Sequence, residues 1–461
     1  MSRRTGRDRR AGPATRVRVA VEPGGRRAGV AIRRRGGSPL SRRLPHLENA
    51  LARWSRGLKA AVVLEGTVEP DGAFVADRVI RDGGEDVSRR SPAARRARLE
   101  RILGNVGSPL VRLAPFAAPE PPSRARAARP SRDDDDRGVP HDLRRIVDEL
   151  RSLEVASRDG VLALPGGQRL EVTRLDKVFW PGLGITKGEL MRYYVRVSPW
   201  LLPAVADRPL IMRRFPDGIA AKAFYQQRAN ADAPSGVRIE RLPVDRVVPR
   251  RIIGGSLLTL LYMTQIASIS QDPWFSRVGA LDDADHAVID LDPMPGVPFA
   301  TVLDVARFVR DELDRLAVPN VPKTSGASGV HVYVPLAPRT SYATARLFAQ
   351  IVATAVARAH PRVATIERSV DARGRKVYVD YLQNSRGKTL ATAYSARASD
   401  FAGASTPLTW REIDDGVDRR DFTIRTLPAR LRERGDLWAP LRTGRPADLD
   451  AALARLAAAD L

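Results

Sequence analysis

The sequence contains no cysteine, and this absence limits the chemistry open to the protein. Disulfide bonds, zinc-thiolate sites and iron–sulfur clusters all need cysteine, so none of them can form from these residues. Any metal must therefore be held by carboxylate, imidazole or water ligands. Hard divalent ions such as Mg²⁺ and Mn²⁺ suit ligands of this kind.

Long apolar runs are missing as well. No stretch approaches the ~18 consecutive apolar residues of a membrane-spanning helix, and the arginine-rich start lacks the apolar segment and cleavage site of a secretory signal. We therefore expect a cytoplasmic protein without a membrane partner.

Lysine is scarce although the chain is strongly basic, since only seven of its 77 basic residues are lysine. The formal net charge of +24 points to a large polyanion as partner. Nucleic acid is favoured, which would associate the protein with the nucleoid; an anionic membrane surface is the simpler alternative. Lysine is a compact point charge and arginine a planar fork, so a lysine in this background can mark a site that needs the smaller cation.

The length of 461 residues predicts two or three domains, because a single core stops growing at ~250–300 residues. Composition and periodicity divide the chain into five segments. These are a basic, partly disordered arm at 1–43, a small α+β unit at 44–114, a linker at 115–149, a main domain at 150–445, and a helical tail at 446–461. The main domain is the catalytic candidate.

The sharpest signal for chemistry is a pair of acids at the end of the apolar run AVIDLDP. Asp290 and Asp292 would share one face of a strand and could jointly bind a divalent metal near Pro293. A second strand-like segment, KVYVDYL, carries Asp380. Three carboxylates together could hold two metals ~3.5–4 Å apart, enough to activate a 3′-hydroxyl and neutralise a triphosphate. Each segment also has a structural alternative to metal binding. Asp292 and Pro293 could simply form a turn after the strand, and Asp380 could face water from an edge strand.

A loop of small residues, KTSGASG, lies between these acidic segments and leads into the strand VHVYV. Gly326 and Gly329 would let the backbone approach a phosphate, while Ser325 and Lys323 offer a hydroxyl and a cation. His331 points along the strand toward the same region. The alternative is that His331 has only a structural role within its strand and does not contact a phosphate.

In this order, DLDP, KTSGASGVHVYVP and VYVDYL resemble the polymerase domain of bacterial ATP-dependent DNA ligase D, which belongs to the archaeo-eukaryotic primase superfamily. The similarity spans residues 170–440 and includes LDKVFWPGLGITKGELMRYYVRVSPWLLP, RPLIMRRFPDG, STPLTW and FTIRTLPARL. The resemblance implies an α/β (α+β) primase-polymerase fold, with central β-sheets flanked by helices and the small α+β unit in front.

The resemblance also implies roles for single residues. Asp290, Asp292 and Asp380 would be the catalytic ligands of Mn²⁺ or Mg²⁺. Ser325 and His331 would contact the triphosphate of the incoming nucleotide, with Lys323 supporting the same phosphates. Two of the rare lysines, Lys177 and Lys187, would bind the 5′-phosphate across a gap or break. Phe224 and Tyr225 would stack on the template strand, the alternative being core packing.

Three positions depart from the family pattern. Asp272 replaces the histidine of His-Pro-Trp, Gln383 replaces the arginine of Asp-Tyr-Leu-Arg-Asn while Asn384 remains, and Gln227 replaces a lysine after the aromatic pair. Each change removes positive charge or a donor where triphosphate or DNA would lie, and an acid there repels phosphate unless a metal intervenes. Activity would then be weak, altered or lost.

The N-terminal unit resembles part of the adenylation domain of an ATP-dependent DNA ligase, in GGSPLSRRLPHLENAL, AAVVLEGTVEPDG and RRSPAARRARLERIL. It has no Lys-x-Asp-Gly, and Glu65-Gly66-Thr67 stands where the ligase has Asp-Gly-Glu. Without the lysine no covalent adenylate can form, so we expect a degenerate DNA-binding or packing module and not an active ligase. An unrelated α+β domain is the alternative.

The expected function is that of a nucleotidyltransferase, a DNA polymerase or primase that adds nucleotides to DNA ends and gaps in bacterial non-homologous end joining. The expected partners are DNA ends, gapped duplex, nucleoside triphosphates, the bacterial Ku protein and a separate DNA ligase. The alternative is a catalytically weakened scaffold that binds 5′-phosphorylated ends and recruits repair partners. The three departures favour the scaffold, and the retained carboxylates oppose it because they would repel DNA.

Overall fold

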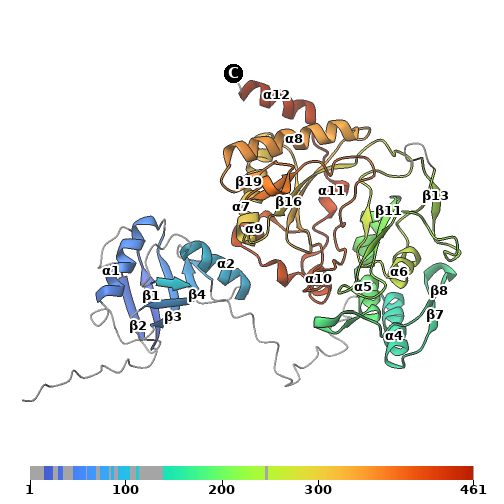
Figure 1. Ribbon diagram of the computed structural model, residues 1–461, viewed down its shortest axis with the longest axis horizontal. Coiled ribbons are helices and arrows are strands. Elements are labelled where there is room, and N and C mark those ends of the chain that lie inside the picture. Colours follow the sequence, from blue (N-terminus) through green and yellow to red (C-terminus); the bar gives the residue numbers. More distant parts are fainter. Residues whose placement is uncertain are drawn as a thin grey trace, which may run out of the picture. The chain divides into compact units, whose positions relative to one another are not determined.

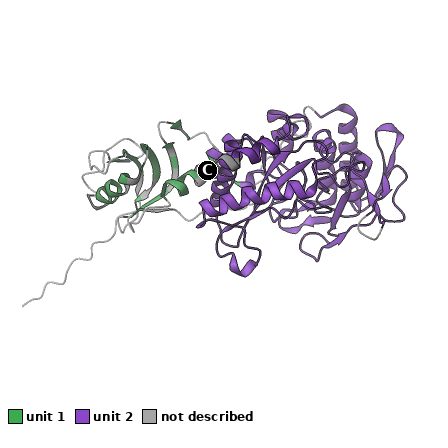
Figure 2. Cartoon of the chain, turned by 90° about the horizontal axis from the view of Figure 1, so that it is seen from above, with its two compact units in different colours: residues 1–127, 415–418 green, residues 128–414, 419–461 purple. Residues whose placement is uncertain are grey.

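The structure, a computed structural model, describes residues 15–23, 30–34, 45–58, 60–68, 73–82, 85–87, 92–103, 111–113, 139–243 and 248–459. The chain forms two compact units, residues 1–127 with 415–418 and residues 128–414 with 419–461 (Figure 2). Within the described ranges, no helix is long and apolar enough to cross a membrane.

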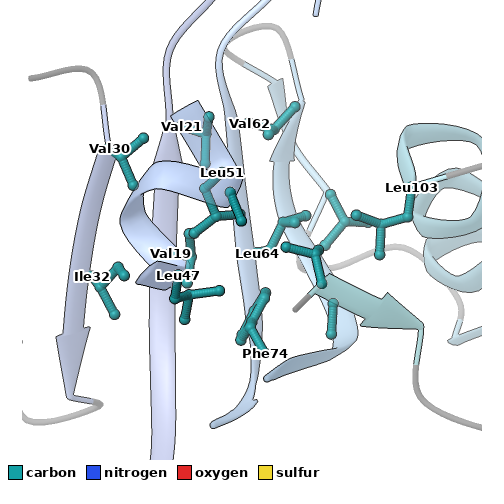
Figure 3. Close-up of a cluster of buried hydrophobic side chains, with 14 of the residues drawn as sticks. Val19, Val21, Val30, Ile32, Leu47, Leu51, Val62, Leu64, Phe74 and Leu103 are labelled. Atoms are coloured by element: carbon teal, nitrogen blue, oxygen red, sulfur yellow. The ribbon is translucent and has the colours of Figure 1, made fainter. Parts of the chain in front are cut away.

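The described part of the smaller unit is a mixed sheet with two α-helices. Its strands run in the order β2-β1-β3-β4-β5, and β6 pairs with β4. The elements are β1 Thr15–Val21, β2 Val30–Arg34, α1 Pro45–Trp54, η3 Ser55–Gly57, β3 Val62–Val68, β4 Phe74–Asp82, β5 Glu85–Asp86, α2 Pro92–Leu103 and β6 Val111–Leu113. Val19 and Val21 alternate with the exposed Arg18, and Leu47 and Leu51 lie one helical turn apart, so each element buries one apolar face in a shared core (Figure 3).

Strands β1 and β2 correct the predicted arm over residues 1–43. They pair with each other, and β1 also pairs with β3, so this part of the segment belongs to the sheet. The arginines gave the segment the composition of a basic arm, although the buried Val19 and Val21 alternate with the exposed Arg18 and the half-buried Ala20, a pattern typical of a half-buried strand. Residues 1–14 lie outside the described residues.

Helix α4, His141–Val155, begins inside the predicted linker 115–149 and corrects the end of that linker. Its buried residues recur at helical spacing, which the neighbouring charge blocks obscured: Leu143, Ile146, Val147 and Leu150. Residues 115–138 are not among the described residues.

The larger unit is built around a five-stranded sheet in the order β17-β18-β16-β20-β19. All neighbours are antiparallel except β19 and β20. The strands are β16 His286–Pro293, β17 Val321–Thr324, β18 Val330–Pro335, β19 Ala364–Thr365 and β20 Val377–Asp380. Helices α7, Phe299–Arg315, and α8, Tyr342–Ala359, pack against it (Figure 1). Val302, Ala306 and Val309 form part of the buried stripe of α7, and the Ser341 hydroxyl caps α8 by accepting from Thr344 N at 3.1 Å.

The remaining elements carry the rest of the candidate site. Strands β12, β11 and β15 form a second sheet, and β7–β8, β9–β10 and β13–β14 are antiparallel pairs. Their bounds are β7 Gly160–Ala163, η4 Pro165–Gly167, β8 Arg169–Val172, β9 Val178–Trp180, η5 Pro181–Leu183, β10 Ile185–Thr186, α5 Lys187–Val205, β11 Leu210–Arg214, β12 Phe224–Gln226, β13 Ile239–Arg241, β14 Arg250–Ile252, α6 Leu257–Gln265 and β15 Asp272–Pro273. Toward the C-terminus lie η6 Val370–Ala372, α9 Trp410–Asp415, η7 Arg419–Asp421, α10 Leu427–Arg434, α11 Ala439–Thr443 and α12 Leu449–Ala459. This mixture of helices and small sheets confirms the predicted α/β (α+β) class.

Candidate active site

A row of polar residues crosses the central sheet. Strand register sets Lys323 of β17 opposite His331 of β18, and His331 opposite Asp290 of β16. Asp290 in turn lies opposite Asp380 of β20. Directly opposed residues of antiparallel strands share a face of the sheet, and Asp292, two residues after Asp290, shares it too. Register therefore brings together five residues that are far apart in the sequence.

The three aspartates form a compact carboxylate group. Each offers one carboxylate oxygen, and these oxygens lie within 4.8 Å of one another. Burial, followed by the carboxyls of Asp292 and Asp380, raises the pKa of Asp290 well above its usual value. The pKa of the more exposed Asp292 is also raised, by desolvation in the site and then by Asp380. A group that holds this much negative charge in little space favours a cation as its partner.

One oxygen of Asp290 supports a cation site directly. Oδ1 is buried and accepts no hydrogen bond from the described residues, although His331 Nε2 lies 3.3 Å away. Asp380, by contrast, accepts from the backbone N–H of Leu382 at 2.7 Å and from Gln383 Nε2 at 2.8 Å. Buried carboxylate oxygens normally have partners, so an unpaired one beside two further carboxylates fits a divalent metal with oxygen ligands.

Lys323 has its contacts within the protein. Its side chain is fully buried, and Nζ lies 2.9 Å from His331 Nδ1, 2.9 Å from Ala391 O and 2.6 Å from Ser405 Oγ. These partners use all three N–H donors of an ammonium. The predicted contact of Lys323 with phosphates stays a prediction, because these three donors have partners within the protein when no nucleotide is bound. The ammonium holds His331.

His331 is thereby fixed in one orientation. Burial, followed by the charges of Lys323 and Arg397, lowers the pKa of His331 well below its usual value, so the imidazole is neutral at pH 7. Burial lowers the pKa of Lys323 as well. While Lys323 is protonated it can only donate, so Nδ1 then accepts and the ring proton lies on Nε2, the nitrogen that faces Asp290. His331 is therefore a donor aimed into the carboxylate group.

The loop before β18 is shaped by its own packing. The Ser325 hydroxyl accepts from Gly329 N at 2.9 Å and keeps its own hydrogen for another acceptor. Gly326 has a φ of +76°, and a Cβ there would lie 2.9 Å from Ser405 N. A Cβ on Gly329 would lie 2.3 Å from Leu291 O. Both glycines are needed for packing against the protein itself, and their predicted close approach to a phosphate stays a prediction.

Arg397 is a functional candidate that the sequence analysis missed. Its Nη1 donates to Ser325 O at 2.9 Å, so the guanidinium lies beside the serine loop. Its charge partly offsets the rise in the pKa of Asp290 and of Asp292. In a chain this rich in arginine, a single arginine carries no local signal.

The structure gives a location to each departure from the family pattern. Asp272 is half-buried in β15, and burial raises its pKa, against the opposing charge of Arg397. Gln383 hydrogen-bonds the Asp380 carboxylate, as described above. Gln227 accepts from Arg251 through both its side chain, at 3.2 Å, and its carbonyl, at 3.0 Å, so a cation lies next to this position.

Lys177 and Lys187 lie together at the start of α5. Lys187 N donates to Lys177 O at 2.8 Å. The Lys187 side chain is 3% exposed, and burial, followed by the charge of Arg174, lowers its pKa to about 8. Lys177 pairs with Asp217 at 2.9 Å. Two lysines at a helix N-terminus make an electropositive position that suits an anion.

The aromatic pair lies on the surface. Phe224 and Tyr225 on β12 are 45% and 67% exposed, which excludes the alternative of core packing. The guanidinium of Arg214 lies 5.4 Å from the Phe224 ring centroid, and that of Arg213 lies 5.8 Å from the Tyr225 ring centroid. Exposed rings next to cations suit the stacking of unpaired bases and contact with phosphates.

Together, the carboxylate row and the serine–glycine loop define the framework of a nucleotidyltransferase-type enzyme. Residues 186–438 match the family described as "LigD, primase-polymerase domain". The chain therefore belongs to the LigD primase-polymerase domain family, and the predicted resemblance to this polymerase domain and the predicted fold are both confirmed.

Relatives and a solved structure agree with this assignment. The chain is 33% identical over 281 residues to the multifunctional non-homologous end joining protein LigD of Mycolicibacterium smegmatis, which covers 60% of this chain and 37% of the relative. It is 30% identical over 272 residues to the bifunctional LigD of Bacillus subtilis, covering 59% and 44%. The polymerase domain of Mycobacterium tuberculosis ligase D in complex with DNA aligns at a TM-score of 0.56 and 31% identity, covering 60% of this chain and all of that one. The chain thus spans about two fifths of the length of these curated relatives.

Proposed function

We propose that this protein is a metal-dependent DNA polymerase or primase that adds nucleotides to DNA ends and gaps in bacterial non-homologous end joining. The observation that carries the proposal is the carboxylate group, whose oxygens lie within 4.8 Å of one another in the row that β16, β18 and β20 create. Membership of the LigD primase-polymerase family supports the reaction class. The names of the relatives support the pathway, and the DNA-bound structural neighbour supports the substrate.

Asp290, Asp292 and Asp380 would hold Mn²⁺ or Mg²⁺. When bound, such an ion supplies positive charge that neutralises the triphosphate and lowers the pKa of the primer 3′-hydroxyl. Oδ1 of Asp290 is buried and accepts no hydrogen bond from the described residues, with His331 Nε2 3.3 Å away, so this oxygen is open to a metal ion.

The protein's own donors would orient the nucleotide. Ser325 would donate its remaining hydroxyl hydrogen to a phosphate oxygen, and His331 would donate Nε2–H beside it. Arg397 would add positive charge next to the serine loop. The primer 3′-hydroxyl would release its proton to water, its oxygen would form a bond to the α-phosphorus, the bond from this phosphorus to the bridging oxygen would break, and pyrophosphate would leave.

Residues outside the carboxylate group would hold other parts of the DNA. Lys177 and Lys187 would bind a 5′-phosphate, and Phe224 and Tyr225 would stack on the template strand. Bacterial Ku and a separate DNA ligase are the proposed partners, in the cytoplasm at the nucleoid. The N-terminal unit would act as a degenerate ligase adenylation fragment without ligase activity.

The test is nucleotide addition on a gapped duplex with a 5′-phosphate, with Mn²⁺ and either ribonucleotides or deoxyribonucleotides. The parent protein is compared with Asp290→Ala and with the exposed control Asp232→Asn. We expect extension by the parent and the control alone. If all three proteins bind the gap and none extends it, the polymerase proposal fails and the end-binding scaffold takes its place.

A further inference from the structure

A short hairpin, residues 394–404, carries Arg397. The backbone N–H of Arg397 donates to Gly403 O at 2.8 Å, and Ala396 and Ala404 form an antiparallel bridge. We call this segment the arginine hairpin. The position of the Arg397 side chain depends on the backbone conformation of this hairpin.

The arginine hairpin lies against the serine–glycine loop. Arg397 Nη1 donates to Ser325 O at 2.9 Å, and the Ser399 hydroxyl donates to Gly326 O at 3.1 Å. Burial raises the pKa of Asp290, and the charge of Arg397 opposes this rise, so the guanidinium also acts on the carboxylate group. The hairpin thus brings a cation to the region where the triphosphate of a nucleotide would lie.

Both ends of the arginine hairpin have an unusual backbone conformation. Tyr394, its first residue, has a φ of +67°, a region that a bulky non-glycine residue rarely adopts. Ala402 near the other end is also left-handed, with a φ of +50°. Such conformations persist only where surrounding contacts hold them, and they collect at functional sites. The segment that carries Arg397 therefore needs support from other parts of the protein.

Tyr193 of α5 supports the first of these two residues. Its hydroxyl donates to Tyr394 O at 2.6 Å, and burial raises the pKa of Tyr193 well above its usual value, so the hydroxyl keeps its proton. Tyr394 also donates from its N–H to Ser405 O at 2.6 Å and from its hydroxyl to Asp436 at 2.5 Å. Of these three contacts, only the one from Tyr193 restrains the carbonyl, which fixes the peptide plane that leads on to Arg397.

The next residue of α5 reaches the same hairpin. The Tyr194 hydroxyl accepts from Ala396 N at 3.2 Å. Helix α5 therefore contacts the hairpin at two points, Tyr394 and Ala396, and both of them precede Arg397 in the chain.

We propose that Tyr193 is a positioning residue for nucleotide binding, whose hydroxyl, through Tyr394 O, holds the arginine hairpin in the conformation that aims Arg397 at the serine–glycine loop. This inference rests on the proposed polymerase function and adds to it a residue of another element. Loss of the hydroxyl frees the Tyr394 peptide, lets the left-handed backbone relax and moves Arg397 away from the loop. Binding of gapped DNA does not use this contact and stays as it is.

The test compares Tyr193→Phe with Tyr342→Phe in the full chain. Tyr342 is a buried tyrosine of α8 whose hydroxyl donates to Ser276 Oγ at 3.1 Å, so its variant loses a similar buried hydrogen bond away from the hairpin. Nucleotide addition is measured on a 5′-phosphorylated gapped duplex with Mn²⁺ and either ATP or dATP, whichever the parent adds. Tyr193→Phe should raise the KM for the nucleotide by roughly tenfold, with a smaller change in kcat and unchanged gel-shift binding of the duplex. Tyr342→Phe should keep the parent's KM.

A double-mutant cycle shows whether Tyr193 acts through Arg397. Its readout is the affinity for the same nucleotide with Mn²⁺, measured by isothermal titration calorimetry without primer extension. In an Arg397→Gln background, Tyr193→Phe should change this affinity by less than about twofold, because the hairpin then has no charge to position. Ser399→Ala removes the hairpin's bond to Gly326 O and should also weaken nucleotide binding, which keeps the test valid if Tyr193→Phe fails to fold.

The inference and the polymerase proposal can fail separately. If the parent extends the primer and Tyr193→Phe behaves as Tyr342→Phe does, or if the effects of Tyr193→Phe and Arg397→Gln simply multiply, Tyr193 has only a structural role and the inference is overturned alone. If the parent binds the gapped duplex but neither extends it nor binds ATP or dATP, the polymerase proposal is overturned and the inference with it.

Discussion

Replacing Asp290 with asparagine should stabilise the metal-free protein. The carboxylate oxygens of the three aspartates lie within 4.8 Å of one another, and two unit charges at that distance would repel by about 3.5 kcal/mol at an effective dielectric constant of 20. Burial together with this repulsion raises the pKa of Asp290, so the folded metal-free protein bears the cost either as repulsion or as uptake of a proton. Asp290 has two such neighbours. Solvent at the exposed Asp292 and the nearby charges of Lys323 and Arg397 reduce the repulsion, which leaves a net gain on the order of 1–3 kcal/mol.

Thermal unfolding measures this gain. Each kcal/mol corresponds to roughly 2 °C for a domain of this size, so Asp290→Asn should raise Tm in EDTA by about 2–6 °C. Added Mn²⁺ should raise the Tm of the parent by binding the folded state alone and should do much less for Asp290→Asn. Asp232→Asn, which removes an exposed carboxylate elsewhere, should behave as the parent in both conditions.

The reasoning would be refuted by an Asp290→Asn protein that is less stable in EDTA and responds to Mn²⁺ as the parent does. That result would mean that the buried Oδ1 is satisfied within the protein and that the three carboxylates do not share a cation.

Other residues of the site give three shorter predictions. Recognition of a 5′-phosphate over a 5′-hydroxyl in gel-shift assays should fall between pH 7 and pH 9, because the pKa of Lys187 near 8 means that its charge is lost there, and Lys187→Arg should flatten this profile. Alanine at both Phe224 and Tyr225 should cost about 1–3 kcal/mol per stacked base in fluorescence anisotropy with single-stranded template, with an unchanged Tm because both rings are exposed. Lys323→Met should lower kcat more than it changes KM and should shift the His331 tautomer seen by ¹⁵N NMR, whereas a purely structural role would alter neither the kcat-to-KM split nor the tautomer.

Much of the candidate site could be predicted because its parts are local in the sequence. The apolar run before Asp290 and Asp292 and the β-branched run before Asp380 each predict a strand, and each strand is present. Their convergence could not be derived from spacing, since it depends on the register of β16 with β18 and β20. The convergence of these strands was predicted from the order of the family motifs and not from the spacing of the aspartates.

The environment of Lys323 shows where local reasoning stops. A lysine before a serine–glycine loop has the pattern of a phosphate ligand, but Ala391 and Ser405 lie 68 and 82 residues further along the chain. Only the folded protein brings their oxygens to Nζ. The same limit applies to β1 and β2, where arginine-rich composition outweighed a short alternation of valines that pairs with β3.

The three departures from the family pattern lie outside the row that holds the carboxylates. Gln383 hydrogen-bonds Asp380 without supplying charge, Asp272 shares its surroundings with Arg397, and Gln227 is bound by Arg251. Under the proposed function, each substitution would change the charge around the nucleotide or the DNA and would leave the oxygen ligands in place. We therefore expect these three substitutions to change substrate affinity, and so KM, more than they change the carboxylate group. The intact row together with these altered surroundings favours a polymerase of shifted substrate preference over a scaffold that has lost its chemistry.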